Sequence, residues 1–130
     1  MPSIFSKIIS GELPCYKIAE TDKFLAFLDI TPLAEGHTLV IPKQEVDYFF
    51  DLADDDYAAI LLFAKKIAAA LKKTIPCRKV GITVIGLEVP HAHIHLVPLN
   101  QMQDINFSRP KTPISAERLA EIAELVKGNL

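Results

Sequence analysis

A chain of 130 residues has the size of one domain, long enough to bury a core and too short for two independent ones. Hydrophobic residues make up 50% and charged residues 23% of it, with a formal net charge of −2, which excludes a disordered chain and a basic nucleic-acid-binding surface. No stretch approaches the roughly 18 apolar residues of a membrane span, the first residues lack a signal-peptide pattern, and two isolated cysteines predict neither a disulfide nor a zinc ribbon. We therefore expect one cytoplasmic domain over residues 1–130, which binds no membrane and no nucleic-acid polymer.

Short elements are expected at the start of the chain. Ser3 is placed to cap a short helix that runs to about Ile8. The β-prone runs 16–20 and 24–28 follow, and the three residues between them favour a hairpin turn. The apolar run 37–41 is a third strand before the first long helix.

The strongest helical pattern lies in the middle of the chain. Asp54 can serve as the N-cap of a helix that runs to about Lys73, and the acidic first turn suits the helix dipole. Five residues recur at helical spacing: Tyr57, Ile60, Ala64, Ile67 and Leu71. The lysine pairs 65–66 and 72–73 fit a solvated face and a helix C-terminus, so we assign them no function.

Two strands and a last helix complete the chain. Residues 80–85 and 91–97 favour strands, and after an irregular stretch Ser115 is placed to cap a helix that ends near Gly128. This helix carries an apolar stripe of Leu119, Ile122 and Val126. Because strands and helices are mixed without regular alternation, we expect an α+β domain on a mainly antiparallel, five-stranded sheet rather than a doubly wound parallel one.

Three of the four histidines alternate with apolar residues in the run His91-Ala92-His93-Ile94-His95. Side chains of a strand alternate between its faces at a rise of about 3.3 Å, so the three imidazoles would share one face while the apolar residues point into the core. Packing alone is a poor explanation, because each ring has two nitrogens that need partners and a pKa near 6.5. We therefore expect the histidine face to be functional.

Two kinds of chemistry suit such a face. The histidines could hold a divalent metal, with His37 as an extra ligand. Alternatively, one imidazole could attack a phosphorus centre and form a phosphohistidine, while its neighbours donate hydrogen bonds to the phosphate and a proton to the leaving group. The second is favoured, because no Asp, Glu or Cys lies at short ligand spacing around the three.

The run H-A-H-I-H-L-V resembles the signature of the histidine-triad (HIT) superfamily, in which histidines alternate with hydrophobic residues. Residues 4–14, 24–30 and 36–43 resemble three further blocks of that family in their usual order, so the resemblance covers about residues 3–99. The chain is similar to the small nucleotide-binding, phosphoramidase-like branch. This implies a HIT-like fold with one long central helix, a short N-terminal and a C-terminal helix, a purine nucleotide substrate and no cofactor.

The resemblance also implies a role for each histidine. His93 would attack the α-phosphate of a nucleotide derivative and carry the nucleotidyl group transiently. His95 would contact the phosphate and the leaving group, and His91 and His37 would orient and support the site.

Residues that bind the nucleotide follow from the same resemblance. Asp29 would bind the ribose hydroxyls, although a turn former at a strand end would also explain it. The loop of Gly86, Leu87 and Glu88 would approach the phosphate, because glycine lets the backbone come close. Five apolar side chains would hold the base, although plain core packing would explain them too: Phe5, Ile8, Leu13, Phe27 and Ile30.

Departures from the family pattern qualify these expectations. Some bacterial members hold a structural zinc with two cysteines and a histidine at places where this chain has Ser3, Ser6 and Glu45, so such a zinc site is not expected. Glu88 stands where eukaryotic members have a serine, and a carboxylate there would repel a phosphate unless it were protonated, paired or turned away.

The leading functional hypothesis is hydrolysis of purine nucleoside 5′-phosphoramidates or related nucleotidyl conjugates. The alternatives are a dinucleoside polyphosphate hydrolase and a nucleotide-binding or scaffold protein with little turnover. The natural substrate and the role of residues 100–130 stay unassigned. By resemblance we also expect a homodimer joined through the long helix and the neighbouring strand, and the surplus of apolar residues at Phe49, Phe50, Leu61 and Leu62 indicates a partner surface.

Overall fold

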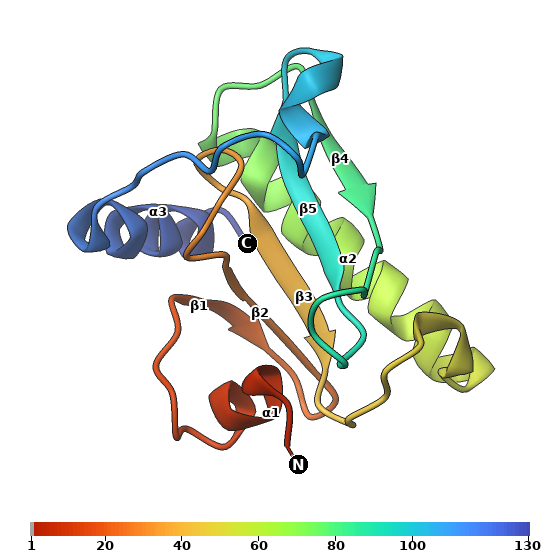
Figure 1. Ribbon diagram of the computed structural model, residues 1–130. Coiled ribbons are helices and arrows are strands. Elements are labelled where there is room, and N and C mark those ends of the chain that lie inside the picture. Colours follow the sequence, from red (N-terminus) through yellow and green to blue (C-terminus); the bar gives the residue numbers. More distant parts are fainter. Residues whose placement is uncertain (1) are drawn as a thin grey trace.

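Five strands form one open antiparallel sheet in the order β1-β2-β3-β5-β4 (Figure 1). The computed structural model describes residues 2–130. The strands are β1 (Lys17–Glu20), β2 (Phe24–Leu28), β3 (Thr38–Pro42), β4 (Lys79–Thr83) and β5 (Ile94–Leu99). The expected α+β fold is confirmed, and so is the hairpin between the first two strands, where Thr21 donates to the carbonyl of Phe24.

Three α-helices accompany the sheet: α1 (Ile4–Ile9), α2 (Asp54–Thr74) and α3 (Ala116–Gly128). The predicted caps of the first and last are confirmed, since Ser3 accepts from the N–H of Ser6 and Ser115 accepts from the N–H of Arg118. Short 3₁₀ helices η1 (Phe49–Asp51) and η2 (Met102–Ile105) complete the fold. Among residues 2–130, no helix combines the length and the apolar character that crossing a membrane requires.

The predicted extent of the long helix is confirmed, but its predicted N-cap is wrong. The N-cap of α2 is Ala53, which makes no side-chain hydrogen bond, and Asp54 is the first helical residue. The three acidic residues of the first turn suit the helix dipole, and one of them, Asp56, also pairs with Lys23 at 2.9 Å. Four members of the predicted stripe, Ile60, Ala64, Ile67 and Leu71, are buried, and the fifth, Tyr57, is partly buried against the same core.

Each face of the sheet has its own apolar cluster. On one face α2 and α3 pack on the larger cluster, which includes Ala92, Ile94 and Leu96 from the histidine run, as expected. Figure 1 shows α2 passing behind β5, with α1 near the opposite side of the sheet. That second side carries a smaller cluster of Phe5, Leu25, Phe27, Leu39 and Ile41. Both faces of β2 and β3 are thus buried, although the second face is covered only in part by α1.

Three predicted strand ends differ from the structure by two or more residues, and two of them lie next to the histidines. β4 ends at Thr83 instead of residue 85, and β5 begins at Ile94 instead of His91. Ala92 donates to the carbonyl of Val46, in the loop after β3, so this stretch leaves the ladder before the strand begins. β5 also continues through Pro98, which it tolerates because β3 pairs with it only as far as Leu96.

Candidate functional site

A cavity of about 560 Å³ opens on the sheet face that carries α1. This volume is in the range of pockets that bind small molecules and nucleotides. Its walls come from α1 and the loop after it, from the ends of β2 and β3, from the loop after β4, from the histidine run and from the chain after η2. Both His93 and His95 line the cavity.

Most residues predicted to bind the nucleotide line this cavity together. They are Phe5, Ile8, Phe27, Asp29, Ile30, Gly86, Leu87 and Glu88. Leu13 is the exception: it does not line the cavity, and the next two residues, Pro14 and Cys15, do so instead. The chain turns after α1, so a one-dimensional pattern could not show which residue of the turn faces inward.

Backbone contacts orient the His93 imidazole. Its Nδ1 lies 2.7 Å from the carbonyl oxygen of His91, which can only accept, so Nδ1 carries the proton. The Nε2 atom of the neutral ring therefore keeps its lone pair. The ring of Phe5 packs edge-on against His93 at a centroid distance of 5.0 Å and restricts its rotation. An oriented, neutral imidazole of this kind is a suitable nucleophile.

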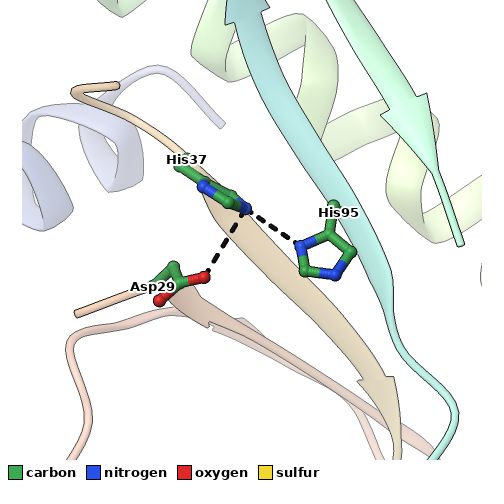
Figure 2. Close-up of side chains that lie close together, drawn as sticks. All are labelled: Asp29, His37 and His95. Carbon is green, nitrogen blue, oxygen red and sulfur yellow. Dashed lines mark hydrogen bonds and ion pairs between the residues drawn. The ribbon is translucent and has the colours of Figure 1, made fainter. Parts of the chain in front are cut away.

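A relay of hydrogen bonds sets the tautomer of His95 (Figure 2). The N–H of Leu33 donates to Nδ1 of His37 at 3.0 Å, so the proton of the neutral His37 ring is on Nε2. This Nε2 donates to Nδ1 of His95 at 3.0 Å. The remaining proton of His95 is thus on its own Nε2, which makes that atom a hydrogen-bond donor.

His91 is sealed away from the cavity, so the picture of three imidazoles on one open face is wrong. Its ring is completely buried, with Nε2 donating to the carbonyl of Pro42 at 2.8 Å and Nδ1 accepting from Oγ of Ser3 at 2.7 Å. Both nitrogens are used internally. His91 can therefore act only through its contacts, above all through the carbonyl that orients His93.

The Nε2 atoms of His93 and His95 are the two ring nitrogens left without a hydrogen-bond partner among residues 2–130. Every fully buried side-chain nitrogen or oxygen in this part of the chain has a partner. Both atoms therefore reach solvent at the cavity. The ring centroids are 4.8 Å apart, so one lone pair and one N–H donor lie side by side.

Burial keeps these rings neutral. Desolvation is the main cause that lowers the pKa of His37, His93 and His95 below the ordinary value, because the charged ring loses its hydration. The carboxylate of Asp29 opposes the shift at all three rings without reversing it. Neutral rings at physiological pH are consistent with one nucleophile and one N–H donor.

The two carboxylate oxygens of Asp29 have different partners: one is hydrogen-bonded to Thr31, and the other lies near His37. Its Oδ1 accepts from the N–H and from the hydroxyl of Thr31, as expected for a turn former at the end of β2. Its Oδ2 lies 3.6 Å from Nε2 of His37 (Figure 2). Since Asp29 also lines the cavity, it combines the turn-forming role with a position open to a ligand.

The loop after β4 brings a carboxylate to the cavity. Gly86 has φ +73°, a conformation that favours glycine, while a Cβ there would meet no atom within 4 Å. Backbone shape, not lack of space, therefore requires this glycine. Glu88 lines the cavity and makes no ion pair with any described residue, so the expected repulsion of a phosphate is not relieved by a protein cation bound to it.

Asp29, His37 and His95 form the group best placed for a metal, with ligand atoms within 4.8 Å of one another. Their hydrogen bonds argue against this use. Nε2 of His37 carries a proton, because Nδ1 accepts from Leu33, so it has no lone pair to offer. Zinc binds deprotonated nitrogens, and the 3.0 Å contact between His37 and His95 is a hydrogen bond.

Glu45 meets Ser3 and Ser6 of the first helix region although it lies far from both in the sequence. The N–H of Ser3 and the hydroxyl of Ser6 both donate to Oε1 of Glu45, the latter at 2.8 Å. These bonds lower the pKa of the Glu45 carboxyl. A hydrogen-bonded cluster thus stands where the resemblance places zinc ligands in other members, and it connects α1 to His91 through Ser3.

An open antiparallel sheet with helices on both faces and buried histidines beside a ligand-sized cavity defines a small α+β binding domain. The HIT domain family matches residues 10–102, and this chain belongs to it. The adenosine 5′-monophosphoramidase hnt1 of Schizosaccharomyces pombe is 35% identical over 132 residues, which cover 100% of this chain and 99% of that protein.

Solved structures share the fold over nearly the whole chain. A HIT-like protein from Bartonella henselae superimposes with a TM-score of 0.84 at 29% identity, covering 98% of this chain and 96% of that one. A zinc-bound histidine triad family protein from Mycobacterium smegmatis gives 0.82 at 28% identity, covering 97% and 91%. The HIT-like fold expected from the resemblance is therefore confirmed.

Sequence reasoning missed two cavity residues from the irregular stretch after η2. Phe107 and Lys111 line the cavity, and the ring of Phe107 lies 4.7 Å from that of His95. No periodicity or motif marks these positions, and both follow the end of the family match at residue 102. Only a long-range contact places them at the site.

Proposed function

We propose that this chain is a nucleotide hydrolase that cleaves purine nucleoside 5′-phosphoramidates or related nucleotidyl conjugates at the α-phosphate. The observation that carries the proposal is the pair of Nε2 atoms at the cavity, a lone pair on His93 beside an N–H on His95. Similarity over the full chain to an adenosine 5′-monophosphoramidase supports it. The cavity volume suits a nucleoside monophosphate.

The reaction proceeds in two displacements. The Nε2 lone pair of His93 forms a bond to the α-phosphorus, the bond from phosphorus to the leaving nitrogen breaks, and the leaving amine takes a proton from solvent. Water then attacks the same phosphorus, the bond to Nε2 breaks, and a proton is released with the nucleoside monophosphate. The carbonyl of His91 holds the Nδ1 proton of His93 throughout, which stabilises the cationic phosphoimidazole.

His95 and the apolar walls bind the rest of the substrate. The Nε2–H of His95 donates to a phosphate oxygen or to the leaving atom, where charge develops. Phe5, Ile8, Phe27 and Ile30 offer apolar surface to the base. Oδ2 of Asp29 accepts from a ribose hydroxyl, while its Oδ1 stays bonded to Thr31.

The test compares the wild type with His93→Gly on adenosine 5′-phosphoramidate, with AMP release followed by chromatography. We expect a loss of at least about 1000-fold and partial recovery with added imidazole, which can fill the gap and act as nucleophile. Calorimetric binding of AMP by the variant shows that the site is still folded. Undiminished turnover by the variant would refute the role of His93.

A substrate panel separates the alternatives. Faster cleavage of diadenosine polyphosphates than of phosphoramidates would favour a dinucleoside polyphosphate hydrolase with the same nucleophile. Tight AMP binding without turnover of any panel member would favour a nucleotide-binding or scaffold protein. Mass spectrometry of a rapidly quenched reaction tests the intermediate, which should appear as a nucleotidyl adduct on the peptide that contains His93.

The assembly proposed with this function is a homodimer, and the cytoplasmic location stays a prediction. Large apolar side chains are exposed on η1, on α2 and on the edge strand β4, namely Phe50, Leu62 and Ile82. Leu61, by contrast, packs partly on the core, and Phe49 is buried in it. Light scattering should give twice the chain mass of 14.4 kDa, and Leu62→Glu should lower it towards the monomer.

A further inference from the structure

The chain between η2 and α3 brings an aromatic ring against the two histidines of the relay. The ring belongs to Phe107, which follows the end of the family match at residue 102 and has no role in the proposed mechanism. Figure 1 shows this part of the chain as the blue stretch before α3. The ring packs edge-on at centroid distances of 4.7 Å from His95 and 5.9 Å from His37. Phe107 therefore packs on both partners of the hydrogen bond that sets the His95 tautomer.

The proton on Nε2 of His37 has two acceptors within reach. Nδ1 of His95 lies 3.0 Å away and Oδ2 of Asp29 lies 3.6 Å away (Figure 2). The shorter contact is a hydrogen bond and the longer one is outside the usual range, so the proton goes to His95. A carboxylate is the stronger acceptor, however, and would take the proton if the His95 ring turned away. The position of the His95 ring thus decides whether the relay is intact and whether Oδ2 of Asp29 stays free for the ribose.

Packing has to supply most of the restraint on the His95 ring. Among residues 2–130 the ring makes one hydrogen bond, to His37, because its Nε2 faces the cavity. Three aromatic or imidazole rings pack on it, at centroid distances of 5.2 Å for His37, 4.8 Å for His93 and 4.7 Å for Phe107. Two of these rings belong to the relay and the nucleophile. Phe107 is the apolar one, and it restrains His95 without competing for its nitrogens.

Hydrogen bonds attach the stretch that carries Phe107 to the loop that fixes His37. Thr112 donates through its N–H to the carbonyl of Pro32 at 2.8 Å and through its hydroxyl to the carbonyl of Leu33 at 2.9 Å. The N–H of Leu33 is the donor that sets the His37 tautomer. One loop therefore fixes both the first histidine of the relay and the backbone that presents the aromatic ring.

Charged and titratable groups also face His95, and burial outweighs them. They are the neighbouring His93, His37 just before β3, Asp29 at the end of β2, and Lys111. Desolvation is the largest cause that lowers the pKa of His95; Lys111 lowers it further, whereas Asp29 raises it. An aromatic ring packed on the imidazole contributes to this desolvation, because it keeps water away from the part that it covers.

We propose that Phe107 is a positioning residue for His95: its ring holds the imidazole against His37, so that the His37 proton goes to Nδ1 of His95 and not to Asp29. Phe107 thus acts through His95, by keeping the N–H of that ring on Nε2 at the cavity. Without the aromatic ring, Asp29 competes for the His37 proton and the tautomer of His95 is no longer fixed. The effect on turnover rests on the proposed function, whereas the tautomer does not.

The experiment compares wild type with Phe107→Ala, with the conservative Phe107→Leu and with the control Met102→Ala, which removes an exposed apolar side chain from η2. ¹⁵N NMR of the His95 ring at pH 7.5 should show the Nε2–H tautomer in wild type and a mixture of both tautomers in Phe107→Ala. Phe107→Leu should largely restore the wild-type tautomer, because a branched apolar side chain still packs on the ring. Met102→Ala should match wild type.

Kinetics on adenosine 5′-phosphoramidate give a second readout. Phe107→Ala should lose about tenfold in kcat, since the donor on His95 is no longer held in place, and Phe107→Leu should lose about threefold or less. The acid limb of the pH profile should move to higher pH in Phe107→Ala, because water at the rings raises their lowered pKa towards the ordinary value. A loss of bulk alone would not move that limb.

An unchanged His95 tautomer in Phe107→Ala would overturn the proposal, even with a lower kcat, because Phe107 would then act on the substrate directly. Urea denaturation shows whether each variant is folded, and Phe107→Val, which gives the ring less support than leucine, replaces the alanine variant if that one is not. If wild type cleaves no phosphoramidate, the proposed function falls, and the NMR comparison still decides the role of Phe107.

Discussion

Single proton positions decide what each histidine of this site can do. All four rings are at least nine-tenths buried, yet each has a backbone carbonyl, a backbone N–H or a neighbouring ring that sets its tautomer. The result is one lone pair, on His93, beside one N–H donor, on His95. With the other tautomer of His37, His95 would have to donate from Nδ1. Its Nε2 would then carry a lone pair instead of the N–H.

Glutamine should replace the His37 ring better than asparagine does, because only the longer side chain can donate to His95. In His37→Gln the amide N–H can approach the place of Nε2 and still donate to His95, whereas in His37→Asn the amide is too short to reach it. We expect His37→Asn to lose about 10- to 100-fold in kcat and His37→Gln to lose clearly less. Equal activity of the two variants would contradict the relay, and ¹⁵N NMR of the His95 ring should show the Nε2–H tautomer only where the relay is intact.

At the scale of elements, the site depends on how α1 is attached to the histidine run. Ser3 caps α1 and also donates to His91, whose carbonyl orients His93. Glu45, from the loop after β3, holds the N–H of Ser3 and the hydroxyl of Ser6. One cluster thus connects a helix, a loop and His91, which lies two positions before His93, the proposed nucleophile.

Removing the Ser3 hydroxyl should therefore affect both folding and catalysis. Ser3→Ala deletes the helix cap and leaves Nδ1 of the buried His91 without a donor, so we expect about 1–3 kcal/mol less stability in urea denaturation. The turnover number should fall while KM for the nucleotide changes little, because the base-binding walls are untouched. Ser3→Thr keeps the hydroxyl and is the matched control; if it behaves like the alanine variant, the hydroxyl is not the cause.

For the whole molecule, burial of neutral histidines couples stability to pH. The folded-state pKa values of His37, His93 and His95 are lowered, so below about pH 6.5 the unfolded chain binds more protons than the folded one. Asp29 reduces this difference at His37 and His95, whereas Lys111 increases it. Stability from this source is complete above about pH 7 and is lost as the pH falls.

Urea denaturation at pH 7.5, 6.5 and 5.5 tests this coupling. The free energy of unfolding should decrease towards pH 5.5, with each of the three histidines contributing up to about 1.4 kcal/mol per pH unit. His37→Gln should show a shallower decrease than wild type, since one buried titrating ring is gone. A stability that stays level across this range would show that the rings are not held neutral by burial.

Much of the fold could be predicted from local patterns. The spacing of apolar residues and the positions of capping and turn residues depend only on residues that are close together in the sequence. The stripe of α2, the caps at Ser3 and Ser115 and the inward-facing Ala92, Ile94 and Leu96 are all of this kind. The order of the blocks and the histidine run also led to the family. Two of the wrong boundaries, at Thr83 and Ile94, occur where loops replace the sheet ladder.

Only the tertiary structure shows which residues far apart along the chain are hydrogen-bonded to one another. Ser3 and His91 are 88 positions apart, His37 and His95 are 58 apart, and Thr112 bonds to Leu33 across 79. Sequence could mark the histidines as functional, but it could not show that His91 is sealed, which nitrogen of each ring is open, or that Phe107 and Lys111 reach the cavity. The hydrogen-bond partners of a buried ring depend on which distant strands and loops pack against it. The spacing of residues within one segment does not show these long-range contacts.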